Sequence, residues 1–304
     1  MNFLASRVIA LGFFDGVHRG HAGLLNMAKL RAAELGLTPA VLSFDLHPDQ
    51  LVAGNRPALI NSVTDRIDII SRVYGITDVV LAHFDNSMMH TPWDVFVEDY
   101  LVGRLGAGHL VCGYDFRFGD RGAGTPELLR EKCSALGISC DVIPRFDIDG
   151  ITVSSTHIRT LLQDGKVAEA ARFLGHPHCL SGEVVRGHQL GRTIGTPTAN
   201  LLIPEGVITP AFGVYATQVT LPDGSVKAAV TNVGVRPTVA DTDSVTVEPW
   251  ILDFDGDLYG KQIRVDFIKR LRGERKFSGL SELQAEILHN AEETRQLLQT
   301  AAPL

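Results

Sequence analysis

Mostly apolar runs alternate with helical patterns through the first half of the chain. Runs of this length are typical of strands that are covered on both faces of a parallel sheet. They lie at residues 8–11, 39–44, 78–82, 110–112 and 140–144. Helical periodicity occupies residues 24–31, 62–74, 92–103, 125–136, 154–162 and 166–174. The alternation predicts an α/β domain with a doubly wound parallel sheet.

The pattern changes from Leu180 onward, where short alternating runs are separated by Gly, Pro and Asp turns. Between two of these runs, the dipeptide Asp-Gly at 223–224 predicts a hairpin. We expect an antiparallel sheet or closed β-barrel of about six strands. A helix should follow over residues 281–300, capped at Ser278 or Ser281. The predicted domains are therefore residues 1–178 and 179–304.

Length and charge narrow the classes of function. A chain of 304 residues suits two domains, each with its own core. A formal net charge of −7 disfavours a nucleic-acid backbone as the main partner, and the apolar runs are too short to span a membrane. The N-terminus shows no secretory signal pattern, so we expect a cytoplasmic protein. Its partners should be small molecules, and the chain should be a monomer or a weak homo-oligomer.

The four cysteines form no CxxC pair. This spacing favours reduced, structural thiols over a disulfide framework or a zinc site.

The segment VIALGFFDGVHRGH, residues 8–21, combines a strand, a glycine turn and the start of a helix. Such a unit points backbone N–H groups and the positive end of a helix dipole at one edge of a sheet, where phosphate binds well. His18 and His21 are three residues apart, which places both imidazoles on one side of a first helical turn. A single loop histidine is usually solvated or packed in a core, but the combination favours a phosphate site.

Polar and aromatic groups also follow two other predicted strands. The segment DLHP places Asp45 and His47 after the second strand, and GYDFRFGDRGAG places Asp115 and Phe116 after the fourth. In a doubly wound sheet the carboxyl ends of the strands face the ligand. Ordinary turns and aromatics packed under a loop give the same patterns, so each segment by itself leaves both interpretations open.

Hydroxyl groups mark the start of the helix at SSTHIR. Ser155 and Thr156 fall at its N-terminus and Arg159 follows one turn later. These hydroxyls either cap the helix or bind a polyphosphate together with the free N–H groups and the arginine.

Three segments of the second domain carry candidate chemistry. The glycine-rich loop GRTIGTPTAN ends with Thr198 and Asn200, which offer hard oxygen ligands suited to Mg²⁺. A carboxylate, Glu248, stands in an apolar strand, and LRGERKF brings Arg272 and Phe277 to the end of the last strand.

The motifs together resemble a known family. GFFDGVHRGH is similar to the HxGH phosphate-binding element of the nucleotidylyltransferase superfamily. SFDLHP, GYDFRFG, SSTHIR, GRTIGTPTAN, the strand glutamate and LRGERKF follow in the order seen in bifunctional riboflavin kinase/FAD synthetases. The resemblance covers about residues 6–295 and implies an HxGH-type α/β domain followed by a β-barrel kinase domain.

This resemblance implies two reactions, phosphorylation of riboflavin to FMN by the second domain and adenylylation of FMN to FAD by the first. Both use ATP, with Mg²⁺ as the metal. The implied catalytic residues are Glu248, His18 and His21. The implied ATP-binding residues are Gly12, Phe13, Asp15, Gly16, Ser155, Thr156, Arg159, Gly191, Arg192, Gly195 and Thr198. The implied flavin-binding residues are Asp45, His47, Asp115, Phe116, Asn200, Arg272 and Phe277, and Thr198 and Asn200 would hold the metal.

The chain departs from the family pattern at a few positions. Leu46 replaces a usual proline, Thr196 and Val239 replace usual phenylalanines, and His157 replaces a frequent arginine. Two alternatives stay open at this point. One is an adenylyltransferase with another acceptor, and the other is a flavin-binding regulatory protein that has lost one or both activities.

Overall fold

The computed structural model describes residues 5–48, 57–186, 195–236 and 244–300. The chain divides into two compact units. One unit comprises Met1–Ala58 and Arg66–Ser154, and the other comprises Leu59–Asp65 and Ser155–Leu304. Helices α7 (Ser155–Gln163) and α8 (Val167–Leu174) belong to the second unit, where α8 packs on its strands β8 and β13. A functional boundary after residue 178 stays a prediction.

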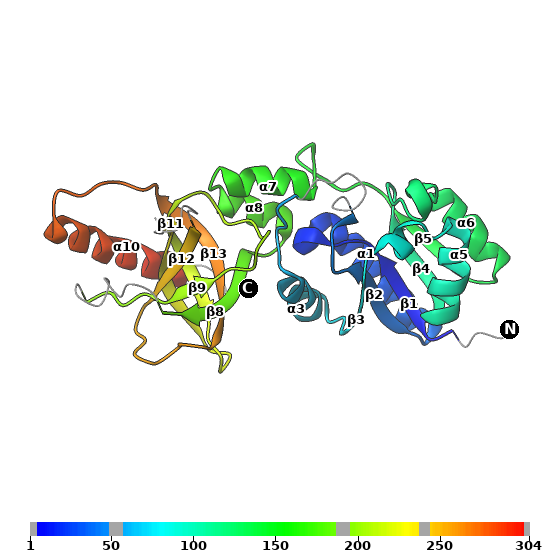
Figure 1. Cartoon of the computed structure of the whole chain (residues 1–304), viewed down its shortest axis with the longest axis horizontal. Coiled ribbons are helices and arrows are strands. Elements are labelled where there is room, and N and C mark those ends of the chain that lie inside the picture. The colour runs from blue at the N-terminus through cyan, green and yellow to red at the C-terminus, as the bar shows by residue number, and fades with distance from the viewer. Residues whose placement is uncertain (1–4, 49–56, 187–194, 237–243, 301–304) are drawn as a thin grey trace. The chain divides into compact units, whose positions relative to one another are not determined.

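The first unit is built on a parallel sheet with the strand order β3-β2-β1-β4-β5, which confirms the predicted α/β fold (Figure 1). The strands are β1 (Arg7–Leu11), β2 (Thr38–Phe44), β3 (Asp78–Ala82), β4 (Ala107–Gly113) and β5 (Ser139–Ile143). The helices are α1 (Arg19–Leu35), α3 (Val63–Tyr74), α4 (Asn86–Met89), α5 (Trp93–Val95) and α6 (Pro126–Ala135). Short elements complete the unit, namely η1 (Asp15–Val17), η3 (Asp120–Gly122), β6 (Asp147–Ile148) and β7 (Ile151–Thr152).

The segment predicted as one helix over residues 92–103 contains two types of helix. After the single turn α5, it continues as the wider π-helix η2 (Phe96–Arg104). Its buried side chains are Phe96, Val97, Leu101 and Val102, which repeat every five residues. A turn of i→i+5 hydrogen bonds places such a repeat on one face, whereas an α-helix would spread it. The five-residue spacing of the apolar side chains therefore explains why the segment forms a π-helix and not the predicted α-helix.

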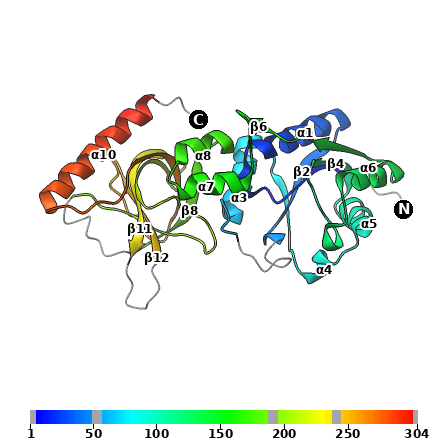
Figure 2. The same cartoon turned by 90° about the horizontal axis from the view of Figure 1, so that it is seen from above.

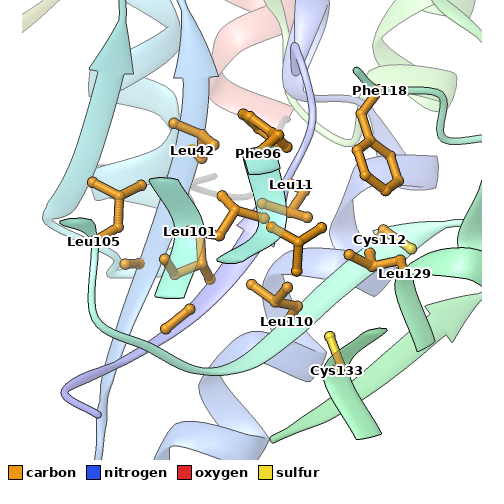
Figure 3. Close-up of a cluster of buried hydrophobic side chains, with 14 of the residues drawn as sticks. Leu11, Leu42, Phe96, Leu101, Leu105, Leu110, Cys112, Phe118, Leu129 and Cys133 are labelled. Carbon is orange, nitrogen blue, oxygen red and sulfur yellow. The ribbon is translucent and has the colours of Figure 1, made fainter. Parts of the chain in front are cut away.

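One buried hydrophobic cluster of this unit lies between the sheet and the elements η2 and α6 (Figure 3). Leu11 and Leu42 from the sheet meet Phe96 and Leu101 from η2 in this cluster. All four cysteines are free thiols. Cys112 and Cys133 are fully buried members of the cluster, as expected for structural thiols.

The second unit is a closed barrel in the order β10-β11-β12-β9-β8-β13, which confirms the predicted barrel. Its strands are β8 (His178–Val185), β9 (Asn200–Leu202), β10 (Gly213–Thr220), β11 (Val226–Arg236), β12 (Ser244–Ile251) and β13 (Gln262–Arg272). The predicted hairpin joins β10 and β11, where Asp223 accepts hydrogen bonds from the N–H and hydroxyl groups of Ser225 and Gly224 has a φ of 82°.

A long terminal helix, α10 (Leu280–Thr300), packs on β10 and β11 (Figure 2). Its start is fixed by Glu282, which accepts hydrogen bonds from the backbone N–H and the hydroxyl of Ser278 at 2.9 and 2.7 Å. The helix begins at Leu280, so neither predicted serine is its N-cap, and Ser278 contributes instead through these bonds to Glu282. The helix supplies one wall of a cavity described below.

Candidate functional sites

The first candidate site surrounds the turn between β1 and α1. Buried apolar residues fix β1 in the centre of the sheet, and the chain then turns sharply after Leu11. Phe14 and Val17 hold left-handed conformations with φ of 60° and 43°, which non-glycine residues seldom adopt. Asp15 is 3% exposed and Gly16 has a φ of 80°. Strained backbone of this kind gathers at ligand-binding turns.

His18 and His21 stand together at the start of α1. Their rings are stacked with centroids 3.6 Å apart and an interplanar angle of 12°. Phe14 lies edge-on to His21 at 5.1 Å. Desolvation of the ring, with the neighbouring His18 and Arg66, holds the pKa of His21 well below its usual range. Nδ1 of His21 has no hydrogen-bond partner among the residues that the structure describes, so a neutral ring is placed to bond to a ligand.

The end of β2 lies beside this turn. His47 meets the ring of Phe13 edge-on at a centroid distance of 4.6 Å. Asp45 is bonded to His83 Nδ1 at 2.6 Å and accepts the N–H of Phe84 at 3.0 Å. Desolvation would raise the pKa of Asp45, but these hydrogen bonds outweigh it and the pKa is lowered. The structure thus brings His47 next to the predicted phosphate turn, whereas Asp45 is held by His83.

The loop after β4 flanks the same edge of the sheet, because β4 is the other neighbour of β1. Asp115 is exposed there, and Phe116 stacks on Phe118 at 5.4 Å against the core. The loop passes so close to Trp93 that a Cβ at Gly119 would lie 2.5 Å from the Trp93 Cα, at a φ of +73°. Only glycine fits at that position.

Ser155 and Thr156 form the first turn of α7, and Arg159 follows half-buried. These residues belong to the second unit, whereas the two histidines belong to the first. Their joint action on one ATP molecule stays a prediction. His157, which departs from the family pattern, packs edge-on against Phe173 of α8 at 4.7 Å.

The second candidate site is a pair of cavities in the barrel unit. A larger barrel cavity of about 640 Å³ is bounded by the end of β8, the loop before β9, β12 and the loop before β13. Its lining includes Arg186, Thr198, Pro249, Phe254, Asp255 and Tyr259. A smaller barrel cavity of about 360 Å³ lies between strands β10 to β12 and α10. Its lining includes Thr198, Asn232, Glu248, Trp250, Arg272 and Phe277.

Strand β12 separates the two cavities. Because side chains alternate along a strand, Glu248 and Trp250 line the smaller cavity while Pro249 and Ile251 line the larger one. Thr198, in the loop before β9, borders both. The two cavities therefore adjoin at Thr198, whereas Glu248 faces the smaller one.

Arg272 and Phe277 close one side of the smaller cavity. The Arg272 guanidinium lies 5.4 Å from the centre of the Phe277 ring, and Arg275 lies 4.6 Å from it. Glu286 of α10 pairs with Arg272 at 3.2 Å and with Arg275 at 3.5 Å. Desolvation lowers the pKa of Arg272, which Glu286 opposes. The cations are thus held around an aromatic side chain at the cavity.

The other predicted site residues of the barrel unit differ in their relation to the two cavities. Asn200 begins β9 with its side chain 9% exposed, and the described lining of the two cavities does not include it. Gly195 has a φ of 75° in the loop before Thr198. Gly191 and Arg192, and the departure at Val239, lie outside the described residues. Thr196 is 4% exposed and lines the smaller cavity.

Sequence reasoning missed several cavity residues. Trp250 stands two residues after Glu248, so strand alternation could have placed it on the same side. Asn290, which accepts a hydrogen bond from Arg272 Nε at 3.1 Å, comes from α10 and has no local signal.

The donor set fits a magnesium ion that is held largely by substrate phosphates. Within the described ranges, no group of three or more His, Cys, Asp or Glu side chains is placed to hold a metal ion. Thr198 offers a hydroxyl oxygen that borders both cavities, and Mg²⁺ is usually bound by few protein oxygens together with phosphate and water.

Comparison with known proteins places the chain in a family. The model for riboflavin kinase matches residues 174–298, and the model for FAD synthetase matches residues 2–157. The bifunctional riboflavin kinase/FMN adenylyltransferase of Bacillus subtilis is 34% identical over 95% of this chain and 92% of its own length. The protein of the same name from Escherichia coli is 35% identical over 97% and 94%. This chain belongs to the family of bifunctional riboflavin kinases/FMN adenylyltransferases.

A solved structure supports the fold. The crystal structure described as a macrolide-efflux protein from Streptococcus pneumoniae superposes with a TM-score of 0.85 and 30% identity. The superposition covers 96% of this chain and 94% of the Streptococcus pneumoniae chain. Among the described helices, none has the length and apolar character needed to cross a membrane. Neither the family models nor the names of the curated relatives favour the regulatory alternative or another adenylyl acceptor.

Proposed function

We propose that this chain phosphorylates riboflavin to FMN and then adenylylates FMN to FAD, using ATP in both steps. The observation that carries the first reaction is the pair of barrel cavities that share Thr198 across β12. The second reaction is supported by the stacked histidines at the β1–α1 turn and by the match to FAD synthetase over residues 2–157.

In the barrel unit, ATP occupies the larger cavity and riboflavin the smaller. The smaller cavity is lined by apolar and aromatic side chains that include Val214, Val230 and Trp250, which suit the isoalloxazine ring. Tyr259 and Arg186, whose guanidinium lies 5.5 Å from the tyrosine ring centre, offer flat surfaces in the larger cavity. The ribityl chain then extends toward Thr198 and Glu248.

Phosphoryl transfer takes place where the cavities meet. Glu248 orients the 5′-hydroxyl of the ribityl chain and accepts its proton as the oxygen attacks the γ-phosphorus of ATP. The bond from the γ-phosphorus to the bridging oxygen breaks, and ADP leaves. Thr198 bonds to phosphate oxygens, and Arg272 closes the flavin side of the site.

Thr198 would hold Mg²⁺ together with the phosphates, and we propose Asn200 as a further ligand, as the family resemblance implies. The ion, when bound, supplies positive charge that offsets the charge of the phosphates.

Adenylyl transfer takes place at the β1–α1 turn. An oxygen of the FMN phosphate attacks the α-phosphorus of ATP, the bond to the β-phosphate oxygen breaks, and pyrophosphate leaves. The attacking phosphate is already an anion, so the reaction needs no covalent enzyme intermediate. His18 and His21 align the phosphates, which lie against the turn over residues 13–16. The flavin of FMN lies against His47, Asp115 and Phe116, and a part for Ser155, Thr156 and Arg159 in binding ATP stays a prediction from the family resemblance.

A time course tests this proposal. The purified chain is incubated with riboflavin, ATP and Mg²⁺, and flavins are separated by chromatography. We expect FMN to appear first and FAD to follow with a lag. Flavin that stays bound but unconverted would contradict the proposal and favour a regulatory protein. FAD formed only from added FMN would contradict the kinase assignment and direct attention to Thr196.

A further inference from the structure

Arg66 is a buried arginine of α3 that belongs to none of the motifs. Its exposed fraction is 1%, and its Nη1 atom donates to three oxygens at the carboxyl ends of β1 and β2. These are the Phe13 carbonyl at 2.7 Å, the Ser43 hydroxyl at 2.7 Å and the Phe44 carbonyl at 3.0 Å. Ser43 also donates its hydroxyl to the Phe13 carbonyl at 2.9 Å. Arg66 and Ser43 thus tie the glycine turn to the neighbouring strand.

The same guanidinium stacks on the turn. Its Cζ lies 4.2 Å from the centre of the Phe13 ring, within the range of a cation–π contact. The next residue, Phe14, holds the left-handed conformation and touches the ring of His21. Phe13 also meets His47. Arg66 therefore fixes Phe13. On one side of Phe13 the predicted adenylyl site continues through Phe14 to His21, and on the other side Phe13 meets His47.

Arg66 remains charged in this environment. Burial lowers the pKa of Arg66 to about 10, while the carboxylates Asp15 and Asp45 oppose that effect. Nε and Nη2 are buried and have no hydrogen-bond partner among the described residues. Natural proteins rarely leave such donors unpaired, so a charge kept at this position points to a role beyond filling the core.

We propose that Arg66 is a positioning residue for adenylyl transfer, because it clamps Phe13 of the β1–α1 turn to the end of β2 and so aligns the turn with its histidines. The inference rests on the function proposed for the first unit. Arg66 acts through Phe13 and the turn, not on the substrate itself. Loss of the clamp should misalign bound ATP and FMN and slow the transfer more than it weakens binding.

The test compares Arg66→Met, Arg66→Lys and Ser43→Ala in the full chain. Arg72→Met is the matched control, because Arg72 lies on the same helix, has a side chain that is 44% exposed and pairs with Asp68 at 3.4 Å on the surface. Each variant is assayed for FAD formation from FMN and ATP and, separately, for FMN formation from riboflavin. Thermal unfolding shows whether each variant is folded.

We expect Arg66→Met to lower kcat for FAD formation about 30-fold, with the KM for ATP changed less than about threefold. FMN formation should be unchanged. A lysine ammonium group carries three N–H donors for the three oxygens, so Arg66→Lys should recover kcat to within about fivefold of wild type. Ser43→Ala, which removes one acceptor, should lower kcat about threefold, and Arg72→Met should match wild type.

Three results would overturn the inference. One is a kcat for Arg66→Met within twofold of wild type, and another is a folded Arg66→Lys variant no more active than Arg66→Met. If Arg66→Met does not fold, a folded Ser43→Ala variant with the same kcat for FAD formation as wild type would overturn it. Wild-type protein that forms no FAD would instead mean that the proposed function has failed, and the inference with it.

Discussion

Glu248 and Pro249 are consecutive residues of β12 whose side chains line two different cavities. A single strand therefore separates the two cavities, and Thr198 lies where they adjoin. If the two cavities hold ATP and riboflavin as proposed, the phosphoryl group has only a short distance to move between them.

The Glu248→Gln substitution should abolish most riboflavin phosphorylation. An amide keeps the size and hydrogen bonding of the side chain but cannot accept the hydroxyl proton, so kcat should fall about 10²- to 10⁴-fold. Riboflavin binding and FAD formation from added FMN should persist. The exposed Glu205→Gln variant is the control. Retention of more than a tenth of the wild-type kcat would remove Glu248 from the base role.

The His21→Ala substitution should act on the other reaction. Loss of one ligand-facing imidazole from the stacked pair should lower the rate of FAD formation at least about 100-fold, since it removes a preorganised hydrogen bond to the phosphates. FMN formation should be unchanged. His90→Ala, at a side chain that is 63% exposed, is the control. Normal FAD synthesis by His21→Ala would show that adenylyl transfer takes place elsewhere.

Stability should depend on the protonation of His178 in the barrel. Burial lowers the pKa of His178 to about 3, with His176 adding to the effect. A histidine whose pKa is depressed on folding contributes its full stability above its unfolded pKa of about 6.5, and that stability is lost as the pH falls below this value toward 3. The free energy of unfolding should therefore decrease by roughly 4 kcal/mol between pH 7 and pH 3 through this group.

Urea unfolding at several pH values measures this dependence. The chain has two tryptophans, so a Trp93→Phe background lets Trp250 report on the barrel unit. The His178→Gln variant should show a flatter decline of stability with acid, whereas the exposed His289→Gln control should follow wild type. Equal acid dependence of wild type and His178→Gln would contradict the prediction.

Two glycines with the same backbone conformation should differ in their tolerance of alanine. Gly119 and Gly137 both have a φ of +73°, but a Cβ at Gly119 would lie 2.5 Å from the Trp93 backbone, whereas nothing lies within 4 Å at Gly137. Gly137→Ala should cost about 1 kcal/mol of unfolding free energy from backbone strain. Gly119→Ala should cost at least about 3 kcal/mol, because the loop must shift. Equal unfolding midpoints for the two variants in urea would show that the Gly119 contact is unimportant.

The sequence predicted those features that depend on local pattern. The central strand and the paired histidines follow from an apolar run and a three-residue spacing, and the structure has both. The barrel and its Asp-Gly hairpin follow from alternation and turn chemistry.

The sequence did not predict features that depend on tertiary contacts. Arg66 looks like any polar position of an amphipathic helix, and only the packing of α3 against the ends of β1 and β2 buries it. Asn290 lines the smaller cavity and Glu286 pairs with Arg272 because α10 packs on the barrel, which no local pattern indicates. The π-helix η2 could have been found from its five-residue apolar repeat.

The most direct test of the account follows labelled phosphate from ATP into the flavins. The purified chain is given riboflavin, Mg²⁺ and ATP that carries the label at either the γ- or the α-phosphorus. The γ-label should appear in FMN and then in FAD, whereas the α-label should appear in FAD and never in FMN. An α-label in FMN, or FAD without either label, would contradict the two-reaction account.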